Sequence, residues 1–183
     1  MTHHPARRYG CLALVAKGLI WASPALAENT VSSFEKQLAQ RSSATAVLQK
    51  TCPVMIHAQL LQDPSSPTDP AIIEHLKLLQ SPYAPIIRHV RLFCGSSLRS
   101  EAWNAYIPER LTPETRHILA DGHTPFGRAV GEKNFWRERL PKRTTALPNG
   151  FILENQAILH RQSDNQPIAL VIERYTGASV SSP

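Results

Sequence analysis

The sequence predicts an α+β fold, in which an antiparallel β-sheet carries helices packed on one face. Two pairs of consecutive strand patterns are each joined by a polar turn, which indicates two β-hairpins with antiparallel strands. Helical patterns lie before and between these pairs, which is typical of a layered α+β domain rather than of alternating β-α units. The length of 183 residues suits one domain of this kind.

Two helices are expected ahead of the sheet. Within residues 29–40, Phe34 and Leu38 lie four positions apart, which is the spacing of one helix face. A second helix is expected over residues 44–50, because the Ser43 hydroxyl can accept a free backbone N–H of its first turn. Further along, the sequence predicts a strand over 54–61, a proline-rich surface loop over 63–70 and a helix over 71–79.

The two hairpins are the clearest elements. In residues 85–94 side chains alternate, which places Arg88 and Val90 on one face of a strand. Residues 100–107 form the returning strand and carry Asn104 on one of its faces. Between the hairpins the sequence predicts helices over 113–120 and 124–130 and a basic, irregular segment over 136–143. The second hairpin consists of strands over 151–161 and 168–175.

Residues 1–27 have the three-part pattern of a secretory signal peptide. A basic pair, Arg7 and Arg8, precedes an apolar run, and the run leads to small residues suited to cleavage after Ala27. We therefore expect a periplasmic or secreted mature protein, residues 28–183. An amphipathic N-terminal helix or a misassigned start is the alternative interpretation.

Cleavage changes the charge of the chain. The full sequence has a net charge of +6, and residues 28–183 have 17 basic and 14 acidic side chains, a net charge of +3. A nucleic-acid-binding protein needs a clustered basic surface, so this class is not favoured. No stretch of about 18 apolar residues is present, so no integral membrane segment is expected in the mature chain.

Two cysteines, Cys52 and Cys94, remain after cleavage. An oxidising compartment would allow them to form a disulfide. Such a bond requires their Cα atoms to approach to about 6 Å, and the sequence leaves that distance open.

The usual signatures of metal, nucleotide and hydrolase chemistry are missing from the sequence. The histidines are scattered singly, without the spacing of a zinc site, so we expect no metal. The glycines are also scattered, and no phosphate-binding loop occurs. No G-x-S-x-G motif marks a serine nucleophile.

Two charges lie at core-like strand positions. Arg88 interrupts the apolar strand PIIRHV, and Glu173 lies near the end of IALVIERY. An unpaired buried charge costs roughly several kcal/mol, so each of these two side chains needs a partner. One interpretation is a structural ion pair or a strand edge that reaches water. The other is a pocket in which Arg88 binds a carboxylate and Glu173 binds a hydroxyl group or handles a proton.

Four segments resemble the chorismate pyruvate-lyase (4-hydroxybenzoate synthase) family. They are SSATAVL (42–48), RHVRLFC (88–94), residues 102–108 followed by LTPE (111–114) and TPFGR (124–128), and IALVIERYTG (168–177). The resemblance implies an antiparallel sheet packed against helices around a small buried pocket. It also implies cofactor-free elimination of pyruvate from chorismate to give 4-hydroxybenzoate.

The resemblance implies a role for individual residues. Arg88 and Glu173 would be the catalytic residues, with Arg88 holding the ring carboxylate and Glu173 contacting the ring hydroxyl. The backbone N–H groups of Ala44 and Phe126 would assist them in binding the substrate. Asn104, a further expected substrate-binding residue, stands where the family commonly has an arginine.

Three functions remain open from the sequence. The first is a carbon–oxygen lyase of the chorismate pyruvate-lyase type. The second is an exported, non-catalytic protein that binds a small aromatic carboxylate on the same fold. The third is a structural protein with a filled core. A small aromatic carboxylate such as chorismate or 4-hydroxybenzoate is the expected partner, and a monomer is the expected state.

Overall fold

A computed structural model describes Met1, residues 24–62 and residues 70–181 of the chain. Most of the predicted signal peptide, 1–27, and nearly all of the predicted loop, 63–70, lie outside these ranges. In the ranges that are described, no helix is both long enough and apolar enough to cross a membrane.

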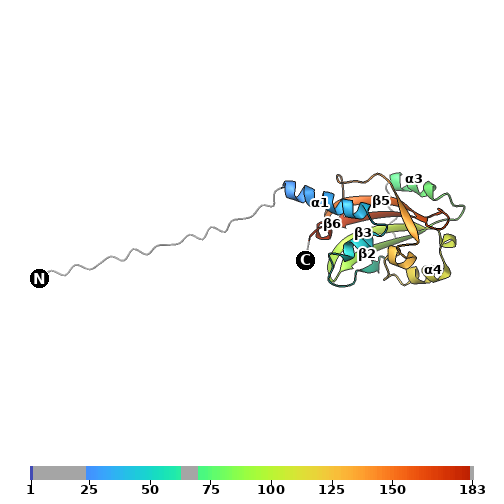
Figure 1. The fold of residues 1–183 in the computed structure, drawn as a ribbon, viewed down its shortest axis with the longest axis horizontal. Helices are drawn as coiled ribbons and strands as arrows, with labels where there is room; N and C mark the ends of the chain where they lie inside the picture. Colours follow the sequence, from blue (N-terminus) through green and yellow to red (C-terminus); the bar gives the residue numbers. More distant parts are fainter. Residues whose placement is uncertain (2–23, 63–69, 182–183) are drawn as a thin grey trace.

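The sheet has six antiparallel strands in the order β1-β2-β3-β6-β5-β4. Figure 1 shows the labelled strands β2, β3, β6 and β5 together in the right-hand part of the view, and they are neighbours in this order in the sheet. Their bounds are β1 (His57–Leu60), β2 (Ile86–Cys94), β3 (Ser97–Tyr106), β4 (Phe135–Arg139), β5 (Phe151–Arg161) and β6 (Pro167–Thr176). Both predicted hairpins are confirmed, as β2-β3 and β5-β6, and so is the α+β class.

Helices cover the sheet at several points. The α-helices are α1 (Pro24–Ala39), α2 (Ala44–Gln49), α3 (Pro70–Leu76), α4 (Pro113–Ala120) and α5 (Phe126–Val130). The chain also has short 3-10 helices, which are η1 (Lys77–Leu79), η2 (Pro108–Arg110) and η3 (Gly177–Ser179). The helix α1 starts ahead of the predicted residue 29 and continues through the predicted cleavage position, Ala27.

The two faces of the sheet have different covers. We call the face that carries Val90 and Val171 the inner face; α1, α2, α4 and α5 pack on it. These four helices share one face, as the sequence predicts, whereas α3 lies on the opposite face through Leu76. The opposite, outer face carries Trp103 and Leu170, and η1 packs on it through Leu79. The inner face is therefore the one on which a site can be enclosed.

The prediction of an irregular segment over 136–143 is wrong for its first part, because Phe135–Arg139 form β4. This strand pairs with β5 and has Arg137 opposite Leu159. Charged side chains occupy most of its positions, which hides the alternation of a strand. Phe135, which is buried, anchors the strand to the core of the inner face.

A disulfide joins Cys52 and Cys94, with their Cα atoms 5.7 Å apart. It connects the turn after α2 to the end of β2. Both cysteines are buried in the core cluster beneath α1 and α2. The bond therefore fixes the end of α2 against the sheet.

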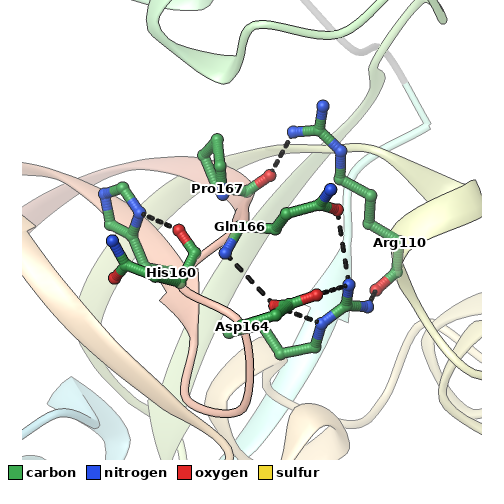
Figure 2. A network of polar contacts seen from close by, with 7 residues as sticks. Arg110, His160, Asp164, Gln166 and Pro167 are labelled. Carbon is green, nitrogen blue, oxygen red and sulfur yellow. Dashed lines mark hydrogen bonds and ion pairs between the residues drawn. The ribbon is translucent and has the colours of Figure 1, made fainter.

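The turn between β5 and β6 is held by a polar network (Figure 2). Arg161 donates through Nε and Nη2 to the two carboxylate oxygens of Asp164, at 2.9 and 2.5 Å. These bonds from Arg161 lower the pKa of Asp164 to about 2. Arg161 also donates to the carbonyl of Arg110, and Arg110 donates to the carbonyl of Pro167. The network therefore joins the turn to η2 and to the first residue of β6.

The outer face holds a fully buried carboxylate, Glu154. It accepts hydrogen bonds from Arg143 Nε at 2.8 Å, from Arg174 Nε at 2.7 Å and from Gln156. Burial alone would raise the pKa of Glu154, but the bonds from the two arginines and Gln156 outweigh burial and lower it.

Acid is therefore expected to destabilise the fold through Glu154. Its folded pKa lies below the ordinary value of 4.5, so the ion pairs stabilise above that pH. Their contribution is lost as the pH falls through the folded pKa. Urea midpoints at pH 7 and pH 3 should differ more for the parent than for Glu154→Gln, which already lacks the charge at pH 7. Equal differences would contradict this role.

Candidate functional site

Arg88, Asn104 and Glu173 lie on the inner face of three neighbouring strands. Arg88 is directly opposite Asn104, and Glu173 lies on β6 two residues beyond the partner of Asn104. Strands are about 4.8 Å apart and residues rise about 3.4 Å, so the Cα atoms of Arg88 and Glu173 are about 12 Å apart. Two long side chains at that separation can reach the two ends of one substituted ring.

A small cavity lies between the inner face and the first turns of α2 and α5. Its free volume is about 30 Å³, on the scale of one or two water molecules. The apolar walls include Val90, Leu92, Ala102, Phe126, Leu159 and Val171, and the polar walls include Asn104, Arg137 and Glu173. A bound aromatic ring would have to displace the side chains that close this space.

Arg88 lies beside the cavity with unused donors. Its side chain is 4% exposed, and Nη2 donates to the carbonyl of Thr124 at 2.9 Å. Nε and Nη1 are buried and have no hydrogen-bond partner. Burial lowers the pKa of Arg88, since it penalises the charged form. Two buried N–H directions without an acceptor are what a carboxylate would satisfy.

Glu173 is held by two neighbours at one oxygen. Its Oε2 accepts a hydrogen bond from the Tyr175 hydroxyl at 2.9 Å and forms an ion pair with Arg137 Nη2 at 2.7 Å. Neither contact uses Oε1. Burial, followed by the charge of Glu173, raises the pKa of Tyr175 well above its usual value, which keeps the phenol a donor. The second oxygen of Glu173 can therefore accept from a ligand.

Arg137 is a site residue that the sequence analysis missed. Its side chain is 7% exposed. Burial alone would lower the pKa of Arg137, but the charge and hydrogen bonds of Glu173 and Tyr175 outweigh it and raise the pKa. The alternation of Phe135, Arg137 and Arg139 was the only signal of a strand here. Because two of these three residues are charged, it does not resemble a core strand.

Asn104 faces the cavity with an unsatisfied acceptor. Its side chain is 3% exposed, and its Oδ1 has no hydrogen-bond partner. It lies directly opposite Arg88. A ligand that places a donor here would satisfy this oxygen. The polar atoms of Asn104 and Arg88 thus leave an acceptor and two donors unpaired on the same area of the inner face.

The remaining expected residues, Ala44 and Phe126, are the first residues of α2 and α5, and both line the cavity. The two helix starts meet at Gly127, where an added Cβ would lie 2.9 Å from Ser43 Oγ. That oxygen already accepts the Ala46 N–H at 3.2 Å as the cap of α2. The glycine of the TPFGR segment is therefore needed for close packing of the cavity wall.

In the part of the chain that the structure describes, no three His, Cys, Asp or Glu side chains gather to bind a metal ion. The cavity instead offers Arg137, Glu173 and the amide of Asn104 around apolar walls, and the buried Arg88 lies opposite Asn104 on the neighbouring strand without lining the cavity itself. These are groups for binding and orienting an acidic organic molecule.

The fold and the site define an α+β protein with a small polar cavity under the helix-covered face of its sheet. No family model matches the chain. It is similar to the uncharacterized protein y4mC of Sinorhizobium fredii (strain NBRC 101917 / NGR234), with 34% identity over 185 residues. The match covers 84% of this chain and 76% of y4mC. The chain therefore belongs to the same family as y4mC, whose name carries no activity.

Proposed function

We propose that the protein is a chorismate lyase-like enzyme, which eliminates pyruvate from chorismate to give 4-hydroxybenzoate. The observation that carries the proposal is the placement of Arg88 and Glu173. Both lie on the buried inner face, about 12 Å apart by strand spacing, at opposite ends of an apolar area. This arrangement favours a site over a structural protein with a filled core.

In this proposal the protein acts mainly by orientation and charge. The unpaired N–H groups of Arg88 hold the ring carboxylate, helped by the backbone N–H of Ala44. The ring hydroxyl donates to Oε1 of Glu173, and its oxygen accepts from the backbone N–H of Phe126. With both ends of the ring fixed, the ring C–O bond to the enolpyruvyl group breaks and the hydrogen on the hydroxyl-bearing ring carbon is lost as a proton. The departing group gains one proton at its methylene carbon and leaves as pyruvate, and aromatisation of the ring drives the elimination.

One experiment tests the proposal directly. The purified protein is incubated with chorismate, and 4-hydroxybenzoate is followed by chromatography. We expect product above the uncatalysed rate, and loss of that activity in Arg88→Ala. Arg116→Ala, a substitution on the exposed surface of α4, is the control and should keep the activity. No product above the uncatalysed rate would reject the lyase.

A second candidate is an exported binder of a small aromatic carboxylate on the same fold. The disulfide between Cys52 and Cys94 favours it, because such bonds persist in oxidising compartments. Export after residue 27 would place the protein in the periplasm or outside the cell, away from a substrate made in the cytoplasm. Calorimetry with 4-hydroxybenzoate separates the two: binding without turnover of chorismate supports the binder.

A further inference from the structure

Arg137 lies between two cavities. On one side it lines the inner cavity next to Glu173. On the other side it lines a second cavity of about 90 Å³ between α1 and the strands β4 and β5. We call the first the inner cavity and the second the α1 cavity; Leu38 and Lys142 are among the residues that line the α1 cavity. Arg137 is therefore part of the partition between the two spaces.

The contacts of Arg137 restrain a single oxygen of Glu173. The ion pair of 2.7 Å is made to Oε2, which also accepts the Tyr175 hydroxyl. The carboxylate is 13% exposed and the arginine side chain 7%. Arg137 Nε is buried without a hydrogen-bond partner. Oε2 is thus held from two directions, and neither of these contacts uses Oε1.

We propose that Arg137 is a positioning residue of the site, which orients Glu173 so that Oε1 receives the hydroxyl of the ligand. The inference rests on the proposed function, since it takes Glu173 as the group that meets that hydroxyl. Arg137 also returns to the site a positive charge that the Asn104 position lacks. It reaches the site from the edge strand β4 instead of from β3.

The physical reason is the cost of an unrestrained buried carboxylate. Without Arg137, Glu173 would keep one neutral donor and lose its counter-ion in a largely buried place. The carboxylate would then turn or bind water, and its hydrogen bond to a ligand hydroxyl would weaken. The carboxylate end of the ligand, at Arg88, would be unaffected, because the Cα atoms of Arg88 and Glu173 are about 12 Å apart.

The test compares two ligands that differ by one hydroxyl group. Calorimetry gives the affinities of the full chain for 4-hydroxybenzoate and for benzoate. The parent should prefer 4-hydroxybenzoate. In Arg137→Met that preference should fall about tenfold or more, the scale of one hydrogen bond to a charged group. The affinity for benzoate should change by less than about threefold, because the site at Arg88 is intact. Arg137→Lys should restore part of the preference.

Two further variants complete the design. Arg139→Met removes an exposed arginine from the same strand, outside the inner cavity, and should leave the preference unchanged. Tyr175→Phe removes only the other donor to Oε2 and should also lower the preference for 4-hydroxybenzoate over benzoate. This variant tests the restraint on Oε2 if Arg137→Met does not fold.

The outcomes separate this inference from the proposed function. An unchanged preference in Arg137→Met and Tyr175→Phe overturns the positioning role and leaves the proposed function standing. An equal loss of affinity for both ligands also overturns it, since that is the effect of a purely structural residue. A parent protein that binds neither ligand overturns the proposed function and this inference together.

Discussion

Replacing Arg88 with methionine is expected to stabilise the fold and to abolish tight ligand binding. Arg88 is 4% exposed, and two nitrogen atoms of its guanidinium group are buried without partners, so the burial of this charge is poorly compensated. An apolar side chain of similar size removes that cost, which should raise the free energy of unfolding by about 1–2 kcal/mol. The same change removes the charge that we propose binds the carboxylate, which should cost about 100-fold in affinity for 4-hydroxybenzoate.

Urea unfolding and calorimetry on the same preparation measure both effects. Arg116→Met is the matched control, because Arg116 is exposed on α4 and lies outside the inner cavity. It should change neither stability nor affinity. An Arg88→Met protein that binds 4-hydroxybenzoate as tightly as the parent would show that the carboxylate site lies elsewhere. A loss of stability would show that Arg88 is a structural residue.

Removing the disulfide is expected to have the largest effect on stability. Cys52 and Cys94 are 42 positions apart, and closing a loop of that length restricts the unfolded chain by about 4 kcal/mol. Replacing both with alanine should lower the free energy of unfolding by about that amount. For a chain of this size the melting temperature should fall by about 10 °C.

Reduction provides an independent check on this value. The parent protein unfolded in the presence of a reductant should match the double variant, because both lack the same covalent link. The double variant itself should not respond to the reductant. A parent protein whose unfolding midpoint is the same with and without reductant would contradict the stabilising role of the bond.

The sheet could be predicted from the sequence wherever the alternation of side chains was apolar. The strands β2, β3, β5 and β6 carry such runs, and the face of Arg88 followed from its place between apolar neighbours. The strand β4 could not be predicted in this way. Its Arg137 and Arg139 point to the same face as Phe135, so charge replaces the apolar signal.

The candidate site was predicted only in part for the same reason. Arg88 and Glu173 were visible as charges in apolar strands, and the structure places them on one buried face. Whether their side chains meet a common partner depends on contacts between distant segments, which periodicity does not carry. The role of Arg137 could not be predicted for this reason, because its partner Glu173 lies 36 positions further along the chain.

The place of β4 at the edge of the sheet has a consequence for how fast a ligand could exchange. An edge strand is bonded to one neighbour only, here β5, so its local opening breaks fewer hydrogen bonds than opening of a central strand. Since Arg137 is part of the partition between the inner cavity and the α1 cavity, local opening of β4 would join the two cavities. We expect ligand exchange to follow the rate of that opening and not the rate of diffusion. Amide hydrogen exchange in β4 would then run on the same timescale as ligand release.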